Sequence, residues 1–96
     1  MKGLSLLLVN KVYQLDYDIV YDKYDSVKIL VFPDTGFDNI VVEHYGKCIK
    51  IEVYDTDIGF KGYAYICLKH KVKSVEYKVK NGILTVKVKY KRFLLF

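Results

Sequence analysis

Apolar and polar residues alternate with a period of two along most of the chain, which is the pattern of β-strands with one buried face. The alternation is clear over Tyr13–Tyr21, where aromatic and aliphatic residues alternate with mostly polar ones. Val27–Phe32 is a nearly continuous apolar run that stops at Pro33, as expected of a strand. No window of ten or more residues has the helical period of 3.6. The pattern therefore predicts an all-β chain.

The residues around Gly46–Lys47 predict a tight hairpin. A glycine followed by one further residue suits a type II′ turn, here between the strands Ile40–Tyr45 and Cys48–Tyr54. A two-residue turn at this place puts Glu43 opposite Lys50 on one face and aliphatic residues opposite each other on the second face. Both faces therefore favour the same register.

A second hairpin is predicted at Asn81–Gly82, because Asn-Gly between two alternating segments is the strongest short-range hairpin signal. The flanking strands are Val75–Lys80 and Ile83–Tyr90, and the turn places Glu76 opposite Lys87 on the outer face. The inner-face pairs of this register are Val75 with Val88, Tyr77 with Val86, and Val79 with Leu84.

A further strand is expected over Tyr63–Lys69, entered through the loop Asp55–Gly62. About seven short strands with one apolar face each need a second layer to bury that face, as in a β-sandwich or a small barrel. The 96 residues are the size of one domain. Within it, residues 1–12 are expected to form a short N-terminal arm or strand, and residues 91–96 an apolar C-terminal tail.

Charge is divided unequally between the two halves of the chain. Residues 1–46 contain four lysines and seven acidic residues, a net charge of −3, whereas residues 47–96 reach +8. A basic half can serve an anionic partner, or it can be the lysine-rich solvent face of a sheet. Fifteen lysines stand beside one arginine, which disfavours bidentate reading of bases. With ten tyrosines, the composition is similar to that of hyperthermophile proteins.

The sequence carries no membrane anchor or secretory signal that we can identify. Its longest uncharged apolar stretch, Gly3–Val9, is far shorter than a bilayer-spanning helix and has no small-residue cleavage site after it. We therefore expect a cytoplasmic protein that does not act at a membrane.

Residues that carry catalysis or bind metals do not converge in the sequence. There is no Gly-rich phosphate loop, no Ser nucleophile motif and no His/Glu metal pattern. His44 is expected at the end of a strand and His70 in a lysine-rich loop, and four aspartates between residues 16 and 25 lack the glycine and closing Glu of a calcium loop. Cys48 and Cys67 lack metal-ligand spacing, and two half-buried thiols are favoured over one disulfide. We expect no enzyme activity, cofactor or metal.

Four groups of segments, in one order along the chain, carry a resemblance to a known family. They are Asp16–Tyr21 with Val27–Pro33 and the following Gly36–Phe37, then Asp38–Val42, then Gly46 with Ile49–Ile51, and finally Asn81–Val86. The last of them, Asn-Gly-Ile-Leu-Thr-Val, resembles the signature Asn-Gly-Val-Leu-Thr-Ile of the α-crystallin domain of small heat-shock proteins. The resemblance covers about residues 16–90. It implies an immunoglobulin-like antiparallel β-sandwich of about seven strands.

The resemblance also implies a function, that of an ATP-independent chaperone of the stress response or a protein-binding adaptor. Its partners would be other proteins, either unfolded clients or one specific partner. Such modules capture an extended apolar segment in a groove at sheet edges, here flanked by analogy by Ile40–Tyr45 and Val75–Lys80. The candidate groove residues are Ile40, Val42, Val75, Tyr77 and Val79, for each of which core packing is the competing interpretation.

Two departures from the family bear on assembly. The loop Asp55–Gly62 is too short for the extra strand that many microbial members exchange between subunits, and the N-terminal arm is short. We therefore expect a monomer or a weakly associated protein that suppresses aggregation modestly. The tail residues Phe93, Leu94, Leu95 and Phe96 are apolar, and we expect them to dock either on their own domain or in the edge groove of a neighbour.

An alternative function rests on charge rather than on family. The face predicted for it consists of Lys78, Lys80, Lys87 and Lys89, which project from one side of the second hairpin. Tyr63 and Tyr65 lie near this hairpin in the sequence. Phosphate contacts from the lysines and stacking on the tyrosines would bind nucleic acid without sequence preference.

Overall fold

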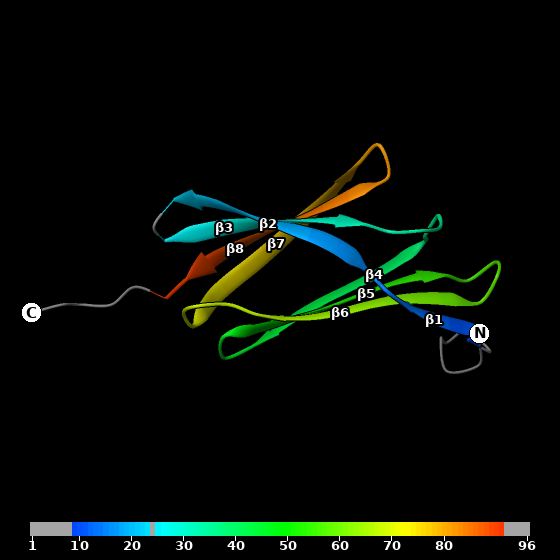
Figure 1. Ribbon diagram of the computed structural model, residues 1–96, viewed down its shortest axis with the longest axis horizontal. Coiled ribbons are helices and arrows are strands. Elements are labelled where there is room, and N and C mark those ends of the chain that lie inside the picture. The colour runs from blue at the N-terminus through cyan, green and yellow to red at the C-terminus, as the bar shows by residue number, and fades with distance from the viewer. Residues whose placement is uncertain (1–8, 24, 92–96) are drawn as a thin grey trace, which may run out of the picture.

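The computed structural model describes residues 9–23 and 25–91, which form eight strands (Figure 1). The strands are β1 (Lys11–Gln14), β2 (Asp16–Lys23), β3 (Ser26–Phe32), β4 (Asn39–Tyr45), β5 (Cys48–Asp55), β6 (Phe60–Cys67), β7 (Val72–Lys80) and β8 (Ile83–Tyr90). The described part of the chain contains no helix able to span a membrane. The predicted all-β chain is confirmed.

Two four-stranded sheets pack face to face as a sandwich that measures 52 × 25 × 19 Å. Sheet A has the strand order β1-β6-β5-β4, and sheet B has the order β2-β3-β8-β7. Neighbouring strands are antiparallel except for β1 and β6, which run parallel. The predicted β-sandwich is therefore confirmed, but with eight strands and one parallel pair in place of about seven antiparallel strands.

The core lies between the sheets and is built from the inward side chains of both. Its buried members are Leu15, Val27, Ile29, Val31, Ile49, Ile51, Val53, Ala64, Ile66, Val72, Leu84, Val86, Val88 and Tyr90. On β8 these residues alternate with exposed lysines, because successive side chains of a strand point to opposite faces. Each fully buried aliphatic side chain stabilises the fold by about 1.5–3 kcal/mol.

The single strand predicted over Tyr13–Tyr21 is wrong, because the chain changes sheets at Leu15. β1 ends before this residue in sheet A, and β2 begins after it in sheet B. The side chain of Leu15 is buried, and its backbone N–H donates to the carbonyl of Tyr63 at 2.9 Å. A Cβ atom at Gly62 would come within 2.6 Å of Leu15 Cδ2, so a glycine is needed on β6 beside the point where the chain leaves sheet A.

Both hairpin predictions are confirmed, including their registers. Glu43 pairs with Lys50 across β4 and β5, and Glu76 pairs with Lys87 across β7 and β8. Gly46 has a φ of 60°, the positive value that the first turn position of a type II′ turn requires. The second turn has positive φ at both central residues, 52° at residue 81 and 77° at residue 82, as in a type I′ turn.

The connection between β5 and β6 is tighter than predicted. Residues 56–59 form a turn, and β6 begins at Phe60 rather than at Tyr63. The backbone N–H of Gly59 donates to the carbonyl of Asp55 at 2.9 Å and helps to close this turn. β5 and β6 therefore form a third hairpin, paired from Cys48 opposite Cys67 to Asp55 opposite Phe60.

Candidate functional site

Strands β4 and β7 form one side of the sandwich. Each is the last strand of its sheet, and the two lie next to each other (Figure 1). Among the strands, β4 pairs only with β5, and β7 only with β8; at the start of β7 the N–H of Val72 donates to the carbonyl of Gly46 in the β4–β5 turn at 2.8 Å. The backbone groups on their outer edges therefore have no strand partner in the described part of the chain. Such edges are templates for an added strand.

The predicted groove residues lie along these two strands, and we call them the edge strip. Its members are Ile40, Val42, Val75, Tyr77 and Val79. Ile40, Val42 and Val75 are partly buried and pack against the core, as the core interpretation of these residues expects. Tyr77 and Val79 are 47% and 45% exposed, so that core packing does not account for them.

The exposure of Tyr77 and Val79 follows from the shape of the β7–β8 hairpin. They pair with Val86 and Leu84, as the predicted inner-face register requires. Val86 and Leu84 on β8 are fully buried, however, whereas Tyr77 and Val79 on β7 are exposed. In Figure 1 the tip of this hairpin, drawn in orange, rises away from the green strands of sheet A. The end of β7 thus extends beyond the part of sheet B that packs against sheet A.

The four predicted lysines of the second hairpin lie on the outer face of sheet B, and all are exposed. Lys28 of β3 belongs with them, because it lies opposite Lys87 in the β3–β8 register. Sequence reasoning missed Lys28, because Val27–Phe32 is a nearly continuous apolar run and no local pattern shows which strand lies beside it. We call Lys28, Lys78, Lys80, Lys87 and Lys89 the lysine face.

Tyr63 and Tyr65 do not lie on the lysine face, which corrects the combination predicted for nucleic-acid binding. Both belong to β6 and stand opposite Glu52 and Lys50 on the outer face of sheet A. Because the two sheets pack by their inner faces, these tyrosines and the lysine face are on opposite sides of the sandwich. Closeness in sequence was misleading here, since β6 and β7 belong to different sheets.

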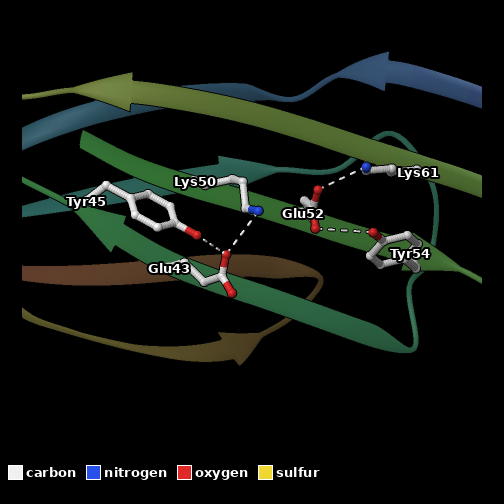
Figure 2. A network of polar contacts seen from close by, with 6 residues as sticks. All are labelled: Glu43, Tyr45, Lys50, Glu52, Tyr54 and Lys61. Carbon is white, nitrogen blue, oxygen red and sulfur yellow. Dashed lines mark hydrogen bonds and ion pairs between the residues drawn. The ribbon is translucent and has the colours of Figure 1, made fainter. Parts of the chain in front are cut away.

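The outer face of sheet A carries a network of paired charges (Figure 2). Lys50 Nζ lies 3.0 Å from Glu43 Oε1, and Lys61 Nζ lies 2.9 Å from Glu52 Oε2. Tyrosine hydroxyls complete each pair: Tyr45 donates to Glu43 at 2.6 Å, and Tyr54 donates to Glu52 at 3.2 Å. The lysines of this face are therefore neutralised by neighbours.

These contacts shift the pKa values of the groups involved. The hydrogen bond from Tyr45, followed by contacts with Lys50, lowers the pKa of Glu43 below its usual value. The pKa of Lys61 is raised, chiefly by its hydrogen bond to Glu52. Burial, with the charge of Glu52, raises the pKa of Tyr54. Every one of these shifts favours the charge state that the network needs near neutral pH.

Cys48 and Cys67 form a disulfide on the same outer face, which corrects the prediction of two unpaired thiols. The two residues are directly opposite each other in the β5–β6 register. The tight turn at residues 56–59 sets this register, so the sequence signal that would have found the bridge is that turn. The bridge lies beside the β6–β7 connection, where the N–H of Leu68 donates to the carbonyl of Lys47 at 2.8 Å.

The histidines and aspartates singled out in the sequence are dispersed over the surface. His44 is exposed near the end of β4, and the ring of His70 packs edge-on against Tyr90 with 5.0 Å between centroids. Asp16, Asp18 and Asp22 are exposed on β2. Among the described residues, no group of three or more His, Cys, Asp or Glu side chains could hold a metal ion.

The predicted docking of the tail residues 93–96 lies outside the described residues, as does most of the predicted arm at residues 1–12. The described part of that arm is exposed at residues 9–12, and from Lys11 onward it is strand β1.

Comparison of the chain with models of known protein families and with curated proteins found no match.

Proposed function

We propose that this protein binds other proteins by capturing an extended apolar segment at the β4–β7 side of the sandwich. It would act as an ATP-independent, small heat-shock-like chaperone or as an adaptor for one partner. The observation that carries the proposal is the exposure of Tyr77 and Val79 on the inward side of an edge strand. Apolar groups in this position lose water only when another segment covers them.

Both kinds of contact needed for strand capture are available at this side. A segment that pairs with the free edge of β7 would extend sheet B and satisfy backbone N–H and C=O groups. Alternate side chains of that segment would face inward, over Tyr77 and Val79 and toward Ile40 and Val42 of β4. Main-chain pairing would give affinity for any extended chain, and the apolar edge strip would favour segments with alternating apolar residues.

The resemblance to the α-crystallin domain supports the same site, since it led by analogy to the strands that the structure has side by side at this edge. Assembly is expected to be weak. The second edge of β6 is occupied by β1 of the same chain, and the β5–β6 connection is a turn of four residues, 56–59. A strand from a second subunit therefore finds no free edge at β6, and the short β5–β6 turn cannot supply a strand for exchange.

A test compares two doubly substituted variants in an assay of suppression of heat-induced aggregation of a client protein, run without reductant so that the Cys48–Cys67 disulfide stays intact. The first variant is Tyr77→Ser with Val79→Ser. The second is a matched control, Tyr65→Ser with Val20→Ser, which removes the same residue types at similar exposure, 50% and 44%, away from the edge strip. The protein should suppress aggregation modestly, and the first variant should lose at least half of that effect.

The control variant should act like the unchanged protein, because residues 65 and 20 lie on the outer faces of the two sheets. Equal losses in both variants would point to general surface hydrophobicity and contradict the assignment to the β4–β7 side. Circular dichroism melting of each variant shows that folding is retained, as expected for exposed positions whose substitution changes stability by about 0.5 kcal/mol or less.

A further inference from the structure

The lysines on the two outer faces differ in their partners. On sheet A, Lys50 and Lys61 each lie within 3.0 Å of a carboxylate oxygen. On sheet B, none of the lysine face residues takes part in an ion pair with any described residue. Glu76 is opposite Lys87 in the register, yet the two side chains do not form an ion pair. With five lysines and Glu76, the outer face of β3, β7 and β8 therefore keeps a net charge of +4.

These lysines are arranged on neighbouring strands rather than scattered. Lys28 and Lys87 are directly opposite each other on β3 and β8, and Lys89 follows two residues further along the same face. From the pair Lys80–Ile83 to Lys89 the face extends about 20 Å along β8. A hollow of about 210 Å³ lies within it, lined by Lys28, Lys78, Lys87, Thr85, Glu76 and Tyr77.

The acidic residues of sheet B limit how a ligand can lie on this face. Asp16 and Asp18 belong to the outer face of β2, where they stand opposite Phe32 and Leu30 of β3. β2 is at the far edge of the sheet from β7. Positive potential is thus concentrated along β7 and β8, and a long anion is favoured along the hairpin and repelled from the β2 edge.

We infer that the lysine face binds the phosphate backbone of nucleic acid without reading its sequence. Repeated, evenly spaced negative charge is the ligand chemistry that complements a row of unpaired lysines. Stacking on Tyr63 and Tyr65 is not part of this site, because these two residues lie on the opposite side of the sandwich. Bidentate base reading is disfavoured as well, since the chain has a single arginine. The lysines project from the outer face of the hairpin, so their contacts with phosphates do not depend on the proposed protein-binding function.

The test is a titration of fluorescein-labelled 16-base-pair duplex DNA of mixed sequence, followed by fluorescence anisotropy at several salt concentrations. If all five lysines contact phosphates, the logarithm of the binding constant should fall with the logarithm of salt with a slope of about −4.5, which is about 500-fold between 50 and 200 mM. Lys87→Gln with Lys89→Gln should reduce the slope to about −2.7, or about 40-fold over the same range.

A charge-matched control separates the lysine face from the general charge of the protein. Lys11→Gln with Lys47→Gln removes the same charge from exposed positions on β1 and the β4–β5 turn and should leave the slope at its original value. Absence of binding at 50 mM salt, or equal changes of slope in both variants, would overturn the inference. A tenfold preference between two duplex sequences, or weaker binding of Tyr65→Ser, would overturn recognition by the backbone alone.

Discussion

Sheet A and sheet B have the same number of strands, but they differ in how their surfaces are completed. Sheet A has its β6 edge covered by β1, its outer lysines paired with glutamates, and a disulfide joining β5 to β6. Sheet B has lysines without ion-pair partners on its outer face and exposed apolar groups on the inner side of β7. Surface groups that have a bonding partner within the chain add stability, whereas charged or apolar groups without such a partner are available to a ligand. The buried core is shared by both sheets, so the comparison concerns their surfaces: stabilising surface contacts are found mainly on sheet A, and groups available to a ligand mainly on sheet B.

The largest expected effect concerns the two residues that pair at the end of sheet B. Leu84 is fully buried, while Val79 directly opposite is 45% exposed. Leu84→Ala should lower the free energy of unfolding by about 2–5 kcal/mol through lost burial and a cavity. Val79→Ala should change it by about 0.5 kcal/mol or less. Urea denaturation followed by circular dichroism measures both. A large loss of unfolding free energy in Val79→Ala would show that the inner face of β7 is part of the core. Sheet B would then have no exposed apolar groups on its inner face that are available to a ligand.

The next effect concerns the covalent link of sheet A. Cys48 and Cys67 are 19 residues apart, and a bridge of this span stabilises a fold by about 3 kcal/mol through the entropy of the unfolded chain. A dithiol reductant should therefore lower the melting temperature by about 12 °C or more. The variant with serine at both positions should melt at the temperature of the reduced protein and should not respond to the reductant. If the oxidised and the reduced protein melt at the same temperature, the disulfide does not contribute to the stability of sheet A.

The smallest effect concerns the charge network of sheet A. The hydrogen bond from Tyr45, together with Lys50, lowers the pKa of Glu43 in the folded state. A lowered pKa adds stability above the unfolded value of about 4.3, and this contribution is lost as the pH falls through the folded value. A titration of the Glu43 carboxyl carbon by NMR should show the lowered pKa, and Tyr45→Phe should raise it toward the usual value. An unchanged pKa in Tyr45→Phe would contradict the role of this hydrogen bond.

Much of the candidate site could be placed from the sequence, because β7 and β8 are joined by a two-residue turn. The Asn-Gly signal and the alternation around it predicted which residues of this hairpin share a face, and the register confirmed it. What could not be predicted was exposure. Tyr77 and Val86 look equivalent along the sequence, yet one is 47% exposed and the other is buried. The difference depends on how far sheet A reaches beneath the hairpin, which involves residues distant in the chain.

Local sequence patterns were enough to predict the all-β character, the two hairpins at Gly46 and Asn81, and which residues of β5 and β8 face inward. These features depend on residues within a few positions of one another, so alternation and turn chemistry suffice to predict them. Tertiary contacts set the change of sheets at Leu15 and the position of Lys28 beside Lys87. They also set which lysines form an ion pair with a carboxylate. The reason is that strand order brings together segments as far apart as β3 and β8, and no local pattern records which strands become neighbours.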